Sequence, residues 1–404
     1  MSTRVLLHVG SPKTGTSHLQ DVLFRNRPRL REQGVLYPAD RHDAHFLAAL
    51  DLMALPWGGL EREAIGRWDG LAREVREHDG TAIVSHEILA TASPTQVDRA
   101  LQSLGAYDGA EVHLVLSVRD LVRQIPAEWQ ENVKHRSTIS YEDFLAELRD
   151  PARTGRIATW FWGVQEVPHV LERWGGSLPP ERVHVVTVPP PGGSPDLLWQ
   201  RFSRVFGLDD LDLEVEAERA NPSLGVPETA LLRRINRAVN AELPPADYRP
   251  LVRELLAHQT LSARTRTPRL ALPPDVHPWA ADLACRWRQE IEQRGYDVVG
   301  DLADLDPAPV VDRWADPDAP RESQVAAAGV EAVKALLLDN ARLRREEARL
   351  AGELHEAHLA LQRAHLRPTY RLREKVLRGV RRTAAGRALH RVYRVVRGRS
   401  SRSA

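Results

Sequence analysis

A glycine-containing loop near the start of the chain constrains its fold more than any other feature. The apolar run at residues 4–9 is typical of a buried strand, and it leads directly into the loop GSPKTGTS at residues 10–17. Residues 16–27 then place apolar side chains on one face of a predicted helix. Inward-turned N–H groups of such a loop, together with the positive end of the helix dipole, bind anions. We therefore expect a phosphate-binding loop between a strand and a helix.

The position of the lysine separates this loop from the Walker A loop of common nucleotide-binding enzymes. Walker A reads G-x-x-x-x-G-K-[ST]. Gly10 and Gly15 keep the spacing of its glycines and Ser17 keeps its hydroxyl group. Thr16, however, occupies the lysine position, and Lys13 lies in the middle of the loop. An ammonium group placed there reaches a bound phosphate from another side, which argues against an ordinary magnesium-ATP kinase or ATPase.

The run from Pro12 to Ser17, with its strand and helix, resembles the 5′-phosphosulfate loop of bacterial P-loop sulfotransferases. These enzymes use 3′-phosphoadenosine 5′-phosphosulfate (PAPS) as sulfuryl donor. The resemblance implies that Lys13 is the catalytic cation, stabilising charge on the bridging oxygen as it leaves. It also implies a set of donor-binding residues in the loop: Ser11, Lys13, Thr14, Gly15, Thr16 and Ser17.

A second segment corresponds to the family element that binds the 3′-phosphate of the donor. The run VHLVLSVRD at residues 112–120 is an apolar strand that ends in Arg119, which matches the family arginine. The family usually has a serine eight residues later, whereas this chain has Ala127. Arg123, one helical turn after Arg119, is the expected substitute because a guanidinium group binds phosphate in a bidentate way; Gln124 is the weaker alternative.

A third segment, RANPSL at residues 219–224, resembles a loop that lies over the adenosine 3′-phosphate in bacterial members of the family. This resemblance adds Asn221 and Ser223 to the expected donor-binding residues. As chemistry alone the segment is a helix-entry turn, and that alternative stays open.

A hydroxyl acceptor needs a general base, and the sequence offers two places for one. The predicted strand at residues 82–86 ends in His86 and is followed by Glu87, and several family members carry the base at this strand end. The second place is the segment after the first helix, which contains His42 and His45. Each of these residues also fits an ordinary structural role, so the choice stays open.

Further apolar runs at residues 82–86, 112–118 and 183–188 alternate with helical segments. Near-continuous Val, Ile and Leu runs between helices indicate buried parallel strands. We therefore expect an α/β fold over residues 1–315: a P-loop-type three-layer sandwich with a central parallel sheet. All ten tryptophans fall inside this predicted catalytic domain.

Several classes of protein and site are excluded or disfavoured. The single cysteine, Cys285, excludes an internal disulfide framework and a cysteine-based zinc site. No metal is expected, because a sulfuryl group carries less charge than a phosphoryl group and no acidic strand end accompanies the loop. No apolar run approaches the ~18–20 residues of a membrane span, and the N-terminal run lacks a small-residue cleavage site. A cytoplasmic location is therefore expected.

The C-terminal part is expected to differ from the domain. Residues 316–322 are predicted to be a linker, and the heptads of residues 323–366 predict a coiled-coil helix and a homodimer. An amphipathic helix that packs back on the domain is the alternative. Residues 367–404 hold twelve arginines and one lysine against one glutamate. They predict a basic amphipathic or disordered tail that contacts the anionic inner face of a membrane, or else a solubilising tail without a fixed partner.

The resemblance, together with these features, implies a sulfotransferase that moves a sulfuryl group from PAPS to a hydroxyl group by in-line displacement. The expected acceptor is a carbohydrate, a glycolipid or a small molecule, and an envelope glycan or glycolipid would suit a tail at the membrane. Four tryptophans are candidates for stacking on sugar rings, or else for core packing: Trp57, Trp68, Trp160 and Trp162. Two other functions stay open, an atypical P-loop nucleotide-dependent phosphotransferase and a non-catalytic nucleotide-binding scaffold.

Overall fold

The computed structural model describes residues 4–194, 196–215 and 223–366. The chain divides into two compact units, the first ending at Ala332 and the second beginning at Val333. The domain boundaries expected near residues 315 and 322 stay predictions. Within the described ranges, no helix is both long enough and apolar enough to cross a membrane.

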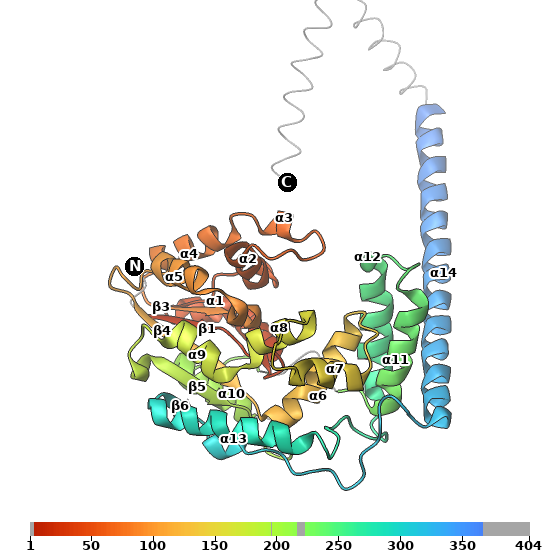
Figure 1. Cartoon of the computed structure of the whole chain (residues 1–404). Coiled ribbons are helices and arrows are strands. Elements are labelled where there is room, and N and C mark those ends of the chain that lie inside the picture. Colours follow the sequence, from red (N-terminus) through yellow and green to blue (C-terminus); the bar gives the residue numbers. More distant parts are fainter. Residues whose placement is uncertain (1–3, 195, 216–222, 367–404) are drawn as a thin grey trace, which may run out of the picture. The chain divides into compact units, whose positions relative to one another are not determined.

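A six-stranded sheet forms the centre of the first unit, with all strands parallel in the order β2-β3-β1-β4-β5-β6 (Figure 1). The strands are β1 (Arg4–His8), β2 (Val35–Leu36), β3 (Thr81–Ser85), β4 (Glu111–Val118), β5 (Val183–Thr187) and β6 (Asp297–Val299). Strand β1 lies between β3 and β4. The loops that follow these three strands therefore leave the sheet at the same edge.

The side chains of β1 alternate between two hydrophobic cores, because successive residues of a strand face opposite sides of a sheet. Leu6 packs with residues of α1 (Thr16–Glu32) and α10 (Leu197–Phe206). Val5 and Leu7 belong to a larger core on the other face. That core includes residues of α2 (Ala44–Met53), α4 (Arg67–Glu77), α5 (Pro94–Ser103), α6 (Leu121–Lys134), α8 (Arg156–Gln165), α9 (Val167–Gly175) and α13 (His277–Arg294). Helices thus cover both faces, and the predicted three-layer sandwich is confirmed.

The remaining helices complete the first unit and lead out of it. They are α3 (Glu61–Ala64), α7 (Tyr141–Arg149), α11 (Val226–Val239), α12 (Pro245–Tyr248), a π-helix (Arg249–Thr260) and α14 (Glu322–Leu366). Short 3₁₀ turns follow β3, at Glu87–Thr91, and β6, at Leu302–Leu305.

Helix α6 starts directly after β4 and is fixed at both its start and its core face. The Asp120 carboxylate caps it by accepting a hydrogen bond from the Val122 N–H at 2.9 Å. Ile125, Trp129 and Val133 have no exposed surface and anchor the helix in the larger core. The orientation of α6 is therefore set by apolar packing, which determines where its polar residues point.

The segment before α14 packs on the first unit. The Asp318 carboxylate accepts the Tyr141 N–H at 2.9 Å and forms an ion pair with Arg233. Burial of Asp318 raises the pKa of its carboxyl group, but the Arg233 guanidinium and the backbone N–H groups together hold that pKa below its ordinary value. The predicted linker residues therefore include a fixed contact.

Helix α14 is 45 residues long and agrees with the predicted long C-terminal helix. Its first turns belong to the first unit, where Glu322 pairs with Arg234 at 2.6 Å and Val325 and Ala328 are buried. In the second unit, apolar side chains of the predicted heptads are exposed: Val333, Leu336, Leu343, Leu350, Leu354 and Leu361. The coiled coil and the homodimer stay predictions.

Candidate functional site

The loop after β1 depends on two glycines. Gly10 has a φ of 129° and Gly15 a φ of 89°, both in the region that side chains disfavour. A methyl group on Gly15 would lie 2.5 Å from a Leu198 methyl group of α10. A methyl group on Gly10 would lie 3.1 Å from the Glu87 carbonyl oxygen. The positive φ favours glycine at both positions, and the approach of the Glu87 backbone adds a packing reason at Gly10.

Hydroxyl groups hold the loop from inside. The Thr14 hydroxyl lies 2.5 Å from the Ser11 carbonyl oxygen and 2.5 Å from Ser117 Oγ. Ser117 Oγ in turn donates to the Gly10 carbonyl at 2.8 Å and lies 3.1 Å from Nε2 of His8. Because the Thr14 hydroxyl is engaged in the loop itself, we expect Thr14 to offer a ligand its backbone N–H group.

Other donors of the loop remain open for an anion. The Ser11 hydroxyl is buried and has no hydrogen-bond partner among the described residues. No side chain caps the N-terminus of α1, whose first turn contains buried Thr16 and exposed Ser17. Uncapped N–H groups at a helix start carry partial positive charge. The loop thus has the donor set of an anion site.

Lys13 extends from the loop to α6. Its ammonium group donates to Glu131 Oε2 at 2.9 Å. The same carboxylate lies 3.2 Å from His135 Nε2, 3.3 Å from a terminal nitrogen of Arg253 and 3.8 Å from Lys134 Nζ. Burial raises the pKa of Glu131, but the hydrogen bond from His135 and the surrounding cations hold it well below its ordinary range. Glu131 is therefore ionised and is shared by several basic groups.

One face of α6 lies over the loop. The Gln124 amide donates to the Pro12 carbonyl at 2.7 Å, and Gln165 of α8 donates to the same carbonyl at 3.3 Å. Gln165 also donates to Glu128 Oε1 at 3.0 Å. Residues 124, 128 and 131 are spaced as one helical stripe, and this spacing is the sequence signal that could have identified Glu128 and Glu131. Our sequence analysis missed both.

Glu128 is a buried carboxyl group in this stripe, with a side chain that is 5% exposed. Burial raises its pKa to about 7, with further upward contributions from Glu131 and Glu87 and opposing ones from Lys13 and Gln165. A carboxyl group that titrates near neutral pH is suited to proton transfer. Lys13 lowers and Glu87 raises the pKa of Glu128, so both groups lie within electrostatic range of it.

His86 and Glu87 directly follow the end of β3, at the same edge of the sheet as the loop after β1. The Gln20 amide of α1 donates to Glu87 Oε2 at 2.9 Å. Burial raises the pKa of Glu87, but His86, the residue's own N–H and Gln20 together hold it below its ordinary value. Burial lowers the pKa of His86, whose Nδ1 accepts the Ile88 N–H at 3.3 Å. In that neutral tautomer, Nε2 carries the proton, so His86 is a donor rather than a base.

The second predicted place for the base divides into one buried and one exposed histidine. His45 is 4% exposed and stacks on Tyr37. Its Nε2 lies 3.0 Å from the Pro38 carbonyl and its Nδ1 accepts the Ser85 N–H at 3.0 Å. Burial lowers the pKa of His45 to about 3. Both ring nitrogens are used by the backbone, so we do not retain His45 as a base; His42 is exposed and faces Asp21 at 3.7 Å.

The two arginines after β4 have different surroundings. Arg123 donates to Asp120 at 3.1 Å and to the Pro189 carbonyl at 3.3 Å, so its guanidinium group is engaged within the protein. Arg119 makes no hydrogen bond or ion pair in the described part of the chain, and its Nε is buried. It lines a small cavity with apolar residues that include Trp287 and Leu305. Burial and the nearby Arg123 lower the pKa of Arg119 to about 10.

The third predicted segment is only partly within the described residues. Asn221 lies outside them. Ser223 is exposed, and its carbonyl accepts a hydrogen bond from Arg269 at 3.4 Å. Its predicted contact with the donor stays a prediction.

Two of the four candidate tryptophans belong to the core. Trp68 has no exposed surface and donates to Ser103 Oγ at 2.9 Å, and Trp162 donates to the Leu148 carbonyl at 3.2 Å. Trp57 and Trp160 are half-buried with ring centroids 6.1 Å apart. Phe46 connects Trp57 to His86, at centroid distances of 5.5 and 5.1 Å. The rings of His86, Phe46, Trp57 and Trp160 thus form a row of neighbours that begins beside the end of β3.

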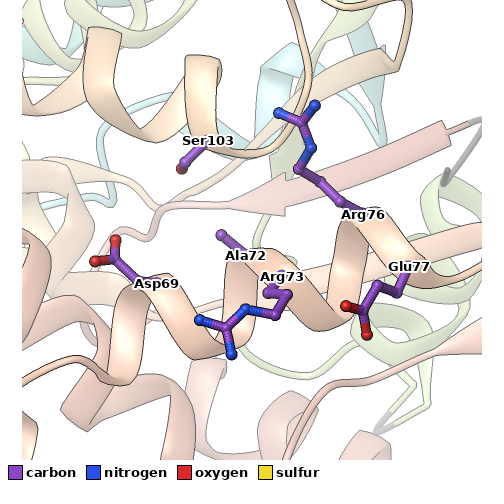
Figure 2. Close-up of a pocket in the computed structure, with 6 residues that line it drawn as sticks. All are labelled: Asp69, Ala72, Arg73, Arg76, Glu77 and Ser103. Atoms are coloured by element: carbon purple, nitrogen blue, oxygen red, sulfur yellow. The ribbon is translucent and has the colours of Figure 1, made fainter.

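A shallow surface pocket over α4 and α5 carries no comparable chemistry. Figure 2 shows its lining residues. Five come from α4 and one, Ser103, from α5; those of α4 are Asp69, Ala72, Arg73, Arg76 and Glu77. Its charges are balanced by surface ion pairs, Arg76 with Asp108 at 2.7 Å and Arg99 with Asp69 at 3.0 Å. The Ser103 hydroxyl is engaged by Trp68 and the Ala100 carbonyl. We therefore place the candidate site at the carboxyl edge of the sheet.

No group of three or more histidine, cysteine, aspartate or glutamate side chains within the described ranges is arranged to hold a metal ion.

Comparison with known proteins found a similarity to a solved structure. No protein-family model matches the chain, and no curated protein matches it. The chain is similar to a sulfotransferase from Alicyclobacillus acidocaldarius, with 18% sequence identity, a TM-score of 0.36, and coverage of 62% of this chain and 96% of that one. A similarity this weak carries no argument about function, so we argue function from the site itself.

Proposed function

We propose that the first unit is a sulfotransferase that moves a sulfuryl group from PAPS to an acceptor hydroxyl. The observation that carries the proposal is the anion-binding loop itself, with its lysine shifted from the Walker position and coupled to a buried carboxyl group. Lys13 supplies the cation and Glu128 is the buried carboxyl group. A cation near the leaving oxygen, open loop donors and a proton acceptor together suit in-line sulfuryl transfer to a hydroxyl.

The proposed reaction balances without a further reactant. The acceptor oxygen forms a bond to sulfur while its O–H proton passes to a carboxylate base. The bond between sulfur and the bridging oxygen of the 5′-phosphate breaks, and adenosine 3′,5′-bisphosphate leaves. Lys13 stabilises the negative charge that develops on the bridging oxygen, and the loop N–H groups hold the 5′-phosphate.

We assign the base to Glu128 in preference to Glu87. A general base is most effective when its pKa lies near the working pH. Each carboxylate accepts one glutamine amide, but the pKa of Glu128 is raised to about 7, whereas that of Glu87 is held below its ordinary value. Glu87 is the alternative base, and the pH dependence of turnover in the Glu128→Gln and Glu87→Gln variants distinguishes the two.

Arg119 is the proposed ligand of the 3′-phosphate. Its half-buried guanidinium group has no protein partner in the described ranges and its Nε is buried, which is costly unless an anion binds. Arg123 is engaged by Asp120, so it holds the start of α6 instead of replacing the missing serine at Ala127.

Calorimetric titration tests this function directly. Adenosine 3′,5′-bisphosphate without metal is titrated into the full chain, alongside ATP with magnesium. We expect tight bisphosphate binding that Arg119→Gln weakens about tenfold or more. Arg123→Gln serves as the matched control and should weaken binding less. Binding of ATP-magnesium alone would instead support a phosphotransferase, and binding of neither nucleotide would contradict the proposed function.

For the C-terminal part we keep two proposals. The exposed heptad residues of α14 support a homodimer through the helix. The basic segment 367–404 lies outside the described residues, and its composition supports peripheral contact with an anionic membrane from the cytoplasm. In that setting the acceptor would be an envelope glycan or glycolipid.

A further inference from the structure

The basic residues around Glu131 form a group that the proposed chemistry does not fully use. We call it the Glu131 cluster: Lys13, Glu131, Lys134, His135 and Arg253. Its members come from the loop, from the end of α6 and from the π-helix, which are far apart in the sequence. Only the tertiary structure brings them together.

The cluster carries more positive than negative charge. Lys13, Lys134 and Arg253 are three cations around one carboxylate. If Lys13 is committed to the donor, Lys134 and Arg253 still exceed Glu131 by one charge. Burial, Lys134 and Arg253 lower the pKa of His258 to about 4, against smaller upward contributions from Glu254 and Glu131. The cluster therefore has capacity for an additional anion.

The donors of the two cations are incompletely satisfied. Lys134 is 2% exposed, yet its ammonium group lies 3.8 Å from Glu131, beyond hydrogen-bond length. Burial lowers the pKa of Lys134 to about 8, with a further contribution from Lys13. The Nε of Arg253 is buried without a partner among the described residues. A buried ammonium group such as that of Lys134 is costly unless a ligand pairs with it, and the Arg253 guanidinium, on a 30% exposed side chain, has a further donor to offer.

We propose that Lys134 and Arg253 form a subsite for an anionic group of the acceptor, so that the enzyme acts on a hydroxyl compound that also carries a phosphate, sulfate or carboxylate. This inference rests on the proposed sulfuryl transfer. The donor uses Lys13 and, in the proposal above, Arg119 at the start of α6. Lys134 is the last residue of the helix, about 20 Å from its first at ~1.5 Å per residue. The subsite lies at the opposite end of α6 from Arg119, which favours the acceptor.

The test uses inorganic sulfate as the probe and full-length protein saturated with adenosine 3′,5′-bisphosphate. Sulfate is titrated at constant ionic strength, with chloride as the balancing anion, and the thermal midpoint is recorded. Binding to the folded state raises that midpoint. We expect sulfate to stabilise the wild type, and the double variant Lys134→Met/Arg253→Gln to weaken apparent sulfate affinity about tenfold or more.

Matched variants separate the subsite from general charge effects. Arg249→Gln removes a charge from the same π-helix, where Arg249 is 74% exposed, and should leave the sulfate response unchanged. Glu131→Gln removes the competing carboxylate and should strengthen sulfate binding. If the double variant does not fold, Arg253→Gln alone, at a 30% exposed side chain, gives the same comparison. An equal sulfate response in the wild type and in the variants overturns the proposal.

Bisphosphate affinity measured in the same proteins distinguishes failure of the acceptor subsite from failure of the proposed sulfuryl transfer. Failure of the wild type to bind bisphosphate contradicts the proposed function, whatever sulfate does. Normal binding by the wild type with loss in the double variant assigns the cluster to the donor and overturns the acceptor proposal. Turnover of glucose 6-phosphate compared with glucose gives the final arm. The proposal expects a lower KM for the phosphorylated sugar, and this difference should disappear in the double variant.

Discussion

The two ends of the central strands both carry buried ionisable groups, but they differ in how completely those groups are paired. At the amino ends, a chain of hydrogen bonds crosses three strands. Glu111 Oε1 lies 2.7 Å from His113, His113 lies 2.8 Å from His184, and His184 lies 2.6 Å from Asp297. Every ring nitrogen of this histidine chain has a partner.

Burial lowers the pKa of the His113 ring, and its hydrogen bond to Glu111 partly opposes that shift. Such a satisfied chain stabilises the pairing of β4, β5 and β6.

At the carboxyl ends the pairing is incomplete. The Ser11 hydroxyl and the Nε groups of Arg119 and Arg253 have no partner among the described residues. Burial raises the pKa of Glu128 to about 7. Buried polar groups are normally hydrogen-bonded, so unpartnered groups beside the loop indicate a place where a ligand completes the network. At the amino ends the histidine chain is fully paired, although Nε of Arg4 is buried there without a partner among the described residues.

The largest expected effect is that of Lys13→Ala. Removal of the cation at the leaving oxygen should lower kcat about 10²–10³-fold or more. The free energy of unfolding should change little, because Lys13 is half-buried and paired with one carboxylate. Sulfuryl transfer is measured from labelled PAPS, with folding checked by circular dichroism. Arg249→Gln is the matched surface variant and should keep normal turnover. Near-normal turnover of Lys13→Ala as well would contradict the assignment of Lys13.

Glu128→Gln should lower kcat about 10²-fold or more, because it removes the proton acceptor. In the wild type the base must be ionised, so the rate should rise with pH through about 7. That acidic limb should disappear in the variant. Glu87→Gln is the matched control. If Glu87→Gln abolishes the limb while Glu128→Gln retains it, the base is Glu87.

The same substitution should also change stability with pH. The pKa of Glu128 is raised on folding, so the folded protein binds the extra proton between about 4.5 and 7 and loses stability as pH rises through that window. Glu128→Gln removes this loss. It should therefore stabilise the apo protein at pH 8 by on the order of 2–3 kcal/mol and have little effect at pH 4. Urea unfolding at the two pH values measures the difference, and equal effects at both would refute it.

His184→Phe should break the histidine chain and leave the site intact. The substitution leaves Nδ1 of His113 without a hydrogen-bond partner and removes the partner of Asp297. The free energy of unfolding should therefore fall by about 2 kcal/mol. Bisphosphate affinity should stay within about twofold of the wild type. His169→Phe, at a 69% exposed histidine, is the control for urea unfolding. A loss of bisphosphate affinity without a loss of stability would reverse the proposed contrast between the two ends.

The smallest expected effect on catalysis comes from α14. Leu343→Glu with Leu350→Glu places charges on the exposed seam and should convert a dimer to a monomer in light scattering. Arg344→Glu adds a glutamate off the seam and should not. Turnover per chain should be unchanged in both proteins. A monomeric wild type would remove the dimer proposal without affecting the site.

The loop and the sheet were largely predictable from the sequence because their signals are local. The strand before the loop, the two glycines and Arg119 at the end of an apolar run are all read from neighbouring residues. The structure confirms the α/β sandwich, with β1, β3, β4 and β5 close to the predicted runs. Strands β2 and β6, of two and three residues, are too short to show a periodicity.

The partners of Lys13 were not predictable in the same way. Glu128, Glu131 and Lys134 read as ordinary polar residues of a helix, and only the packing of Trp129 into the core turns them toward the loop. His45 shows the converse, because a histidine suited to proton transfer is used up by two backbone groups.

The sequence by itself therefore determined the type of fold and the position of an anion-binding loop, since periodicity and glycine placement act over a few residues. Tertiary structure alone decided which charges surround that loop. Glu131 and Arg253 meet across more than a hundred residues of chain, and no local pattern encodes a contact that depends on how helices pack.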